Sequence, residues 1–450
     1  MSYSSNGRRP IELASKSSHH HIINDPEVQR VLGRIYRPPR DAGASIEEMC
    51  VPHVLPAENP IEFFITVDGG YTETAIEKEY PSRLIHFMQF GALYFKTDDL
   101  TSIGRMPFIA PEDMAKLKNI QRLKLVLPTK GVRFNDETSL KGTVLKAVYE
   151  FFLNNTLSES HNLLDTLAWF IFKRYKGGKK NQEDTVWFLD TNPLSPTNAG
   201  VDLKESEMDA STFTFPCPET GGRIYLTDVF RLQQRIDEEL GATGILGYLD
   251  NAIQHLILIH IIRHLLASNP SVLKKVLFIK DGPASFSGLP APMHKPMLDL
   301  VNWLLDRHNI CMAGLEKSGA FVEHANSIRD RMKPGSILIL NDSYIYNRIS
   351  PGEENPNRPY ADTSYYSHKV IYKTTKDKMY VVTLPVRALK KAPSADDIPN
   401  LHAVLANIEK LQCDMYDSAI FPVALVNKLV SLSAFPSQQI LQAFARSTVG

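Results

Sequence analysis

The chain of 450 residues lacks a net charge, because 50 Lys and Arg residues balance 50 Asp and Glu residues. Balanced charge gives no support for nucleic-acid binding over the whole surface, so such an activity would depend on a local basic patch. Cysteines are few and far apart, at Cys50, Cys217, Cys311 and Cys413. This usage excludes a disulfide-rich scaffold and is typical of a reducing compartment, so we expect a cytoplasmic protein.

The chain also lacks an uninterrupted apolar run. The most apolar helix candidate, Ile253–Leu266, contains His255, His260, Arg263 and His264. It is too short and too polar to span a bilayer, so no membrane partner is expected. The polar start predicts no secretory signal, and no internal repeat is visible. The length exceeds one ordinary core, which favours one large elaborated domain or two to three units.

Composition divides the chain into two regions. Residues 1–59 are polar, with Ser-rich and basic patches, and predict an exposed, disordered or partner-binding arm. Three adjacent histidines, His19–His21, could bind a metal loosely, but an exposed arm is the commoner outcome. Residues 60–450 read as an α/β body with a mixed sheet flanked by helices. It carries a large insertion at about 97–230 and a helical C-terminal part at about 400–450.

The most informative feature is a pair of aspartates that follow short apolar runs and precede glycine. The runs are Phe63–Gly70, with Asp68, and Val276–Pro283, with Asp281. Such runs predict buried strands. Two carboxylates on neighbouring strands repel each other unless a cation lies between them. Hard oxygen ligands suit Mg²⁺ or Mn²⁺, the ions of phosphodiester-cleaving sites. Asp-Gly is also a common turn dipeptide, which is the structural alternative for each aspartate alone.

Neighbouring segments extend this hypothesis. A hairpin is expected between Glu62–Val67 and Ser82–Lys96, with its turn at Gly69-Gly70. A helix is expected from Thr227 through Leu240, and a longer one over Tyr248–Ala267. Asp250 and Gln254 lie four residues apart on the longer helix and share one face, which could point at the two aspartates. A strand over Ile310–Leu315 would bring Lys317 to the same rim, where it could bind a phosphate.

The chain resembles the NurA nuclease family, which works with the HerA DNA translocase. The resemblance rests on Phe64–Gly70, the long helix, Leu277–Gly282, Ala313–Ser318 and the late segment Phe421–Asn427. It implies a ribonuclease H-like fold and Mn²⁺-dependent DNA cleavage. It also implies a homodimeric ring on a HerA-like hexameric ATPase. The resemblance further implies that Asp68, Asp281, Asp250 and Lys317 are catalytic, with the three aspartates as metal ligands.

Two positions depart from the family pattern. The family has a glutamate on the long helix, where this chain offers Asp250 or Gln254, and glutamine is a weak ligand for a hard cation. The family has a histidine in the final motif, where this chain has Asn427. His368 could replace it from a loop, although a surface histidine is the commoner role. Two hypotheses follow: an active metal-dependent nuclease, or a catalytically degenerate subunit that supports a translocase.

Overall fold

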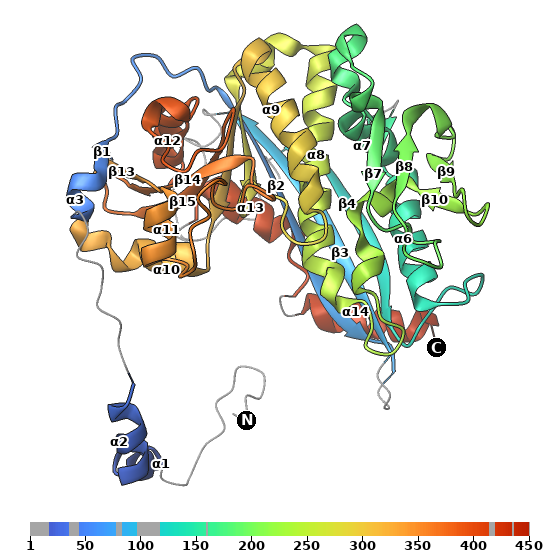
Figure 1. Ribbon diagram of the computed structural model, residues 1–450, viewed down its shortest axis with the longest axis horizontal. Coiled ribbons are helices and arrows are strands. Elements are labelled where there is room, and N and C mark those ends of the chain that lie inside the picture. Colours follow the sequence, from blue (N-terminus) through green and yellow to red (C-terminus); the bar gives the residue numbers. More distant parts are fainter. Residues whose placement is uncertain are drawn as a thin grey trace. The chain divides into compact units, whose positions relative to one another are not determined.

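The computed structural model describes residues 18–35, 45–77, 83–96, 118–158, 161–413, 419–433 and 436–449. The chain divides into two compact units, Met1–Gly43 and Ala44–Gly450. In the first unit, two short helices are described, α1 (Ser18–Ile23) and α2 (Pro26–Gly33) (Figure 1). α2 buries none of its side chains. The boundary between the units thus precedes the position expected at residue 59. Residues 97–117, which begin the predicted insertion, lie outside the described residues.

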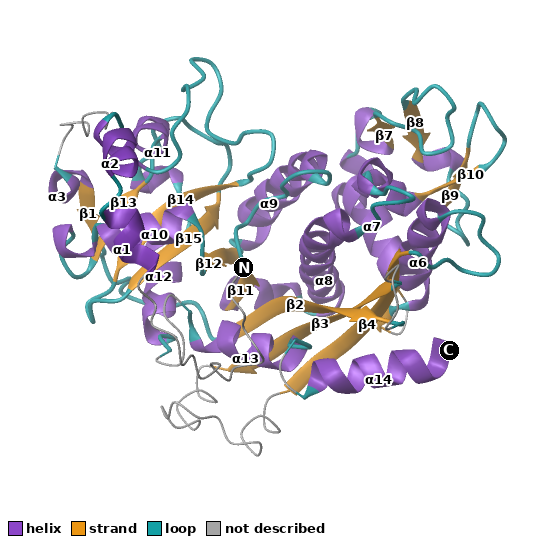
Figure 2. Cartoon of the chain, turned by 90° about the horizontal axis from the view of Figure 1, so that it is seen from below, coloured by secondary structure: helices purple, strands orange, loops and turns teal. Residues whose placement is uncertain are grey.

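The second unit is built on a nine-stranded mixed sheet with the order β1-β13-β14-β15-β12-β11-β2-β3-β4 (Figures 1 and 2). The strands are β1 (Cys50–Pro52), β2 (Phe63–Ala75), β3 (Leu84–Lys96), β4 (Lys118–Lys130), β11 (Val276–Asp281), β12 (Cys311–Glu316), β13 (Ser336–Ile339), β14 (Ser367–Lys373) and β15 (Met379–Pro385). β2, β3 and β4 form an antiparallel meander, and β11 and β12 run parallel to β2. A three-stranded meander followed by two parallel strands is the ribonuclease H-like arrangement. The predicted fold class is therefore confirmed.

Helices cover both faces of this sheet (Figure 2). One face packs against α6 (Leu140–Asn154), α7 (Leu163–Ile171), α8 (Leu246–Ser268) and α9 (His294–His308). The other face packs against α12 (Leu401–Lys410), α13 (Phe421–Val430) and α14 (Ser437–Val449). Three short helices, α3 (Ile46–Met49), α10 (Ala320–Ser327) and α11 (Asp342–Arg348), pack near the β13–β14 edge. The predicted helical C-terminal part is present.

Side chains alternate in direction along β2, so this strand contributes to two hydrophobic cores, one on each face of the sheet. Ile65 and Val67 belong to the core beneath α8, whereas Phe64 belongs to the core beneath α12 and α13. Successive side chains of a strand point to opposite faces.

Residues Thr243–Ser268 are long and apolar enough to cross a membrane, but 78% of the most apolar window is buried inside the fold. This is the pattern of a core helix, because α8 is surrounded by the sheet and its neighbouring helices.

Part of the range predicted as an insertion, about 97–230, belongs to the main fold, because β4 is a strand of the central sheet and α6 and α7 cover it. The rest of that range carries small two-stranded sheets and short 3-10 turns. Its strands are β5 (Thr156–Ser158), β6 (His161–Asn162), β7 (Val186–Leu189), β8 (Val201–Lys204), β9 (Thr214–Pro216) and β10 (Arg223–Tyr225). The helix expected from Thr227 to Leu240 is wrong. Arg231 has a φ of 61°, which no α-helix accommodates, and it separates two 3-10 turns, Leu226–Phe230 and Leu232–Arg235.

The predicted turn at Gly69-Gly70 is also wrong, because both glycines lie inside β2. Helices approach too closely there for any side chain. A Cβ atom on Gly69 would lie 2.0 Å from Oδ1 of Asp250 in α8, and one on Gly70 would lie 2.6 Å from the carbonyl oxygen of Val430 in α13. The glycines are therefore explained by packing on the two faces of the strand. As a consequence, β2 continues well beyond Asp68.

Candidate functional site

Asp68 and Asp281 lie on adjacent parallel strands, as predicted. The β2–β11 register pairs Val67 with Lys280, so that Asp68 and Asp281 follow side by side. Neighbouring strands are about 4.8 Å apart, and paired residues of parallel strands share a face. Asp281 is the last residue of β11, and Gly282 then turns the chain with a φ of 87°. The register places both carboxylates on the face that α13 covers.

The Asp68 carboxylate is 3% exposed and hydrogen-bonded on both oxygens. Oδ1 accepts from the backbone N–H of Gly69 at 2.8 Å, and Oδ2 accepts from Nδ2 of Asn427 at 3.0 Å. Burial and the negative charge of Asp281 raise the pKa of Asp68 to about 8, although Lys317 and the Asn427 bond oppose the rise. Two crowded carboxylates of this kind are stabilised by an added positive charge.

Lys317 supplies one positive charge at this position. Its Nζ atom lies 2.5 Å from Oδ2 of Asp281, with side-chain exposures of 30% for the lysine and 12% for the aspartate. Lys317 follows β12 directly, and β12 pairs with β11 in parallel. Strand topology therefore explains why residues 36 positions apart meet. The Lys317 side chain therefore keeps partial contact with solvent while it pairs with Asp281.

Asp250 lies on the opposite face of the sheet from Asp68. Its Oδ1 atom rests against Gly69, whose missing side chain would point toward α8, whereas Asp68 points toward α13. Oδ2 accepts from Nε2 of Gln254 at 2.8 Å. Among the described residues, Oδ1 of Asp250 has no hydrogen-bond partner. Burial raises the pKa of Asp250 to about 6, against the opposing effect of Lys280. The helix α8 thus places Asp250 next to Gly69, the neighbour of Asp68 in β2, but on the opposite face of the sheet from the Asp68 carboxylate.

Lys280 is a member of this group that sequence reasoning missed. Its side chain is 4% exposed, and Nζ donates to the carbonyl oxygen of Asp281 at 2.8 Å. Burial lowers the pKa of Lys280, while Asp250, Asp281 and Asp68 raise it. A lysine is almost never fully buried unless it is paired. Its position inside the apolar run Val276–Asp281 was the available signal, because a charge within a buried strand requires carboxylates nearby.

His368 does not reach this site. It lies in β14 rather than in a loop, and β14 is separated from β11 by β15 and β12. Three strand spacings amount to about 14 Å. Nε2 of His368 accepts from the backbone N–H of Lys390 at 3.1 Å, and burial lowers the pKa of His368 to about 4. His368 is therefore a neutral structural residue.

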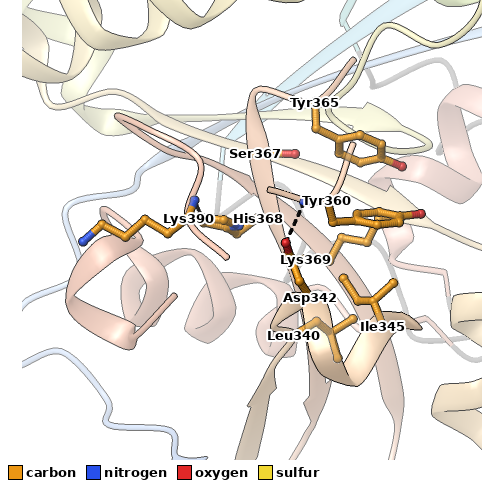
Figure 3. A pocket seen from close by; sticks show the side chains of 9 residues that line it. All are labelled: Leu340, Asp342, Ile345, Tyr360, Tyr365, Ser367, His368, Lys369 and Lys390. Atoms are coloured by element: carbon orange, nitrogen blue, oxygen red, sulfur yellow. Dashed lines mark hydrogen bonds between the residues drawn. The ribbon is translucent and has the colours of Figure 1, made fainter. Parts of the chain in front are cut away.

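His368 instead lines a small cavity between β14 and α11 (Figure 3). The cavity volume is about 20 Å³, enough for one water molecule and too small for a nucleotide. Lys369 lies beside it, with Nζ 2.5 Å from Oε1 of Glu316 and 3.7 Å from the ring centre of Phe321. The lysine and the glutamate are both buried. This pair anchors β14 to the end of β12 and is a structural element.

The Asp68 and Asp281 carboxylates, on adjacent strands and one face of the sheet, are the side chains that could hold one divalent cation. Mg²⁺ commonly takes one or two carboxylates and completes its shell with water and substrate phosphates. The unpartnered Oδ1 of Asp250 is the third acidic oxygen at the same level of the sheet. Within the described ranges, no three His, Cys, Asp or Glu side chains converge as a ready-made metal cluster. The fit is therefore to two carboxylate ligands, with Asp250 behind them.

Comparisons with known proteins extend only to solved structures. No family model matches the chain, and no curated protein matches it. Similar folds include the crystal structure of the NurA nuclease from Sulfolobus solfataricus, at 8% identity and a TM-score of 0.35 over 96% of this chain and 97% of that one. A NurA structure bound to dAMP and manganese matches at 13% identity and a TM-score of 0.26, over 95% of this chain and 94% of that one. At these values, function must be argued from this chain's own residues.

Proposed function

We propose that this protein is a divalent-metal-dependent DNA nuclease. The observation that carries the proposal is the side-by-side placement of Asp68 and Asp281 on β2 and β11, with the pKa of Asp68 raised to about 8 by burial and by Asp281. Strongly perturbed carboxylates of this kind concentrate at functional sites. The ribonuclease H-like topology and the motif resemblance described above are consistent with this assignment.

The proposal gives each residue a physical role. Asp68 and Asp281 hold a Mn²⁺ or Mg²⁺ ion, which when bound activates water and stabilises charge on the phosphate. Asn427 orients the Asp68 carboxylate through its amide. Lys317, which is partly exposed beside Asp281, neutralises a phosphate oxygen. Asp250, on the opposite face of the sheet, contributes negative charge from behind and is left out of the ligand set.

Cleavage of linear DNA tests this function directly. Wild-type protein with Mn²⁺ or Mg²⁺ is expected to degrade the DNA, and Asp68→Asn or Asp281→Asn is expected to reduce cleavage to background with an unchanged fold. The matched control is Asp228→Asn, because Asp228 is equally buried but belongs to the insertion. Full activity in either site variant would show that the catalytic residues lie elsewhere.

A second candidate function follows from the partners of the carboxylates. Asp68 is bonded to an amide of Asn427, Asp250 to an amide of Gln254, and Asp281 to Lys317. Each acid thus has one protein partner without a metal, which favours a degenerate subunit that supports a translocase. Calorimetric titration with Mn²⁺ separates the two functions. Saturable binding that Asp68→Asn abolishes supports the nuclease, whereas no binding at millimolar Mn²⁺ supports the degenerate subunit.

The proposed partners are DNA, a second copy of the chain and a HerA-like hexameric ATPase, in a cytoplasmic role of end resection or antiviral defence. Support for docking by the first unit comes from its exposed apolar side chains, Ile22, Ile23, Val31, Leu32 and Ile35, which are each at least half exposed. Deletion of residues 1–38 should weaken hexamer binding and ATP-dependent degradation of linear duplex. If hexamer binding and ATP-dependent degradation both persist after the deletion, the interface lies on the second unit.

The proposed second copy of the chain is tested separately: light scattering of the purified protein should give the mass of a dimer.

A further inference from the structure

The face of the sheet that carries Asp68 continues to an edge strand with exposed basic residues. The cross-strand register aligns Asp68 of β2 with Gly91 of β3 and Arg122 of β4. The next row on this face aligns Gly70, Gln89 and Lys124 in the same way. Both Arg122 and Lys124 are exposed, whereas Leu123 and Leu125 between and after them point into the core beneath α6 and α8.

The spacing of these cations suits a nucleic-acid backbone. Arg122 and Lys124 are two residues apart on one face of a strand, which is about 6.8 Å. That distance equals about two base steps along one strand of DNA, at 3.4 Å each. Arg122 lies two strand spacings from Asp68, or about 10 Å between Cα atoms. The residues that separate them in these rows are glycines and one glutamine, and α13 packs over them.

α13 bridges the distance between the edge strand and Asp68. Its Leu429 and Val430 side chains lie 3.0 Å from the position of a Cβ atom on Gly91, and the carbonyl oxygen of Leu429 accepts from Nε2 of Gln89 at 2.8 Å. The preceding residues of α13 are Lys428, which is exposed, and Asn427, which bonds Asp68. Within the described parts of the chain, no ion pair involves Arg122, Lys124 or Lys428.

We propose that Arg122 and Lys124 of β4, with Lys428 of α13, form a phosphate-binding track that holds a DNA strand next to the Asp68–Asp281 site. The inference rests on the proposed function and specifies where the substrate backbone lies. Contacts of this kind position the strand and carry no sequence preference. Each contact also releases counterions, so the track has a defined signature in the salt dependence of binding.

The test measures binding of a labelled mixed-sequence oligodeoxynucleotide in EDTA, where cleavage does not interfere, at several salt concentrations. Arg122→Gln combined with Lys124→Gln should weaken binding to all sequences and reduce the slope of log K against log salt by about 1.4 for single strands or about 1.8 for duplex. Lys428→Gln should reduce the slope by about half as much. Lys274→Gln combined with Lys295→Gln is the matched control, because both lysines are exposed and lie outside these rows.

The outcomes distinguish this inference from the function on which it rests. A reduced slope in the β4 variant, with a wild-type slope in the control, supports the track. Wild-type affinity and slope in the β4 variant overturn the track and leave the nuclease standing. Wild-type protein that binds neither single-stranded nor duplex DNA overturns both. Melting curves by circular dichroism check that the variants are folded.

Discussion

A divalent cation that binds beside Asp68 must displace the proton that this carboxyl group retains below about pH 8. Burial and the charge of Asp281 raise the pKa of Asp68 to about 8, and a carboxylate ligand must be ionised to bind metal. One proton is therefore released per bound ion. The apparent affinity for Mn²⁺ should rise about tenfold per pH unit well below this pKa. Between pH 6 and 8 the rise should be about 50-fold, or about 2.3 kcal/mol, because half of the groups are already ionised at pH 8.

Isothermal titration in buffers of different ionisation enthalpy measures this released proton directly. Asp68→Asn should bind Mn²⁺ weakly and without the pH slope. Asp281→Asn should shift the slope to lower pH, because Asp281 is one of the causes that raise the pKa of Asp68. Asp228→Asn should keep the wild-type slope. An affinity that is flat between pH 6 and 8, or an equal slope in Asp68→Asn, would refute the reasoning.

The same shift predicts how stability depends on pH without a cation. In the unfolded chain an aspartate ionises near pH 3.9, whereas native Asp68 keeps its proton until about pH 8. The native state therefore binds more protons in this window, and its free energy of unfolding falls as pH rises from about 4 to 8. Asp68→Asn should flatten this fall, as should saturating Mn²⁺. Urea unfolding at a series of pH values, with and without EDTA, measures both effects.

Two further predictions concern packing around the site. Gly69→Ala would place a Cβ atom 2.0 Å from Oδ1 of Asp250, so it should lower stability by about 1–3 kcal/mol and slow DNA cleavage. The control is Gly244→Ala, whose Cβ atom would have no other atom within 4 Å. It should change neither the melting temperature nor the cleavage rate. Lys369→Met leaves the buried Glu316 carboxylate without its cation and should cost about 3–5 kcal/mol in urea unfolding. Adding Glu316→Gln should recover part of that loss, and a loss below about 1 kcal/mol in the single variant would show that the pair does not anchor β14.

Much of the fold was predictable from local patterns. The apolar runs ending near Asp68 and Asp281 are strands, the segment around Ile253–Leu266 is a buried helix, and the late apolar segments form the C-terminal helices. Hydrophobic periodicity reports these elements because each buries one face or both. The adjacency of the two aspartates was also predicted, although only Asp281 ends its strand and Asp68 lies within β2.

Tertiary packing decided the rest. Gly69 and Gly70 continue a strand instead of turning because α8 and α13 press on its two faces, and nothing local in the sequence reports an approach from residues so distant. Which face of β2 the Asp250 side chain approaches depends on how its helix, α8, crosses the sheet. The pairing of Lys317 with Asp281 and the alignment of Arg122 with Asp68 depend on strand order and register. Sequence alone therefore determines which elements form, whereas the charges that meet across the sheet are set by its topology.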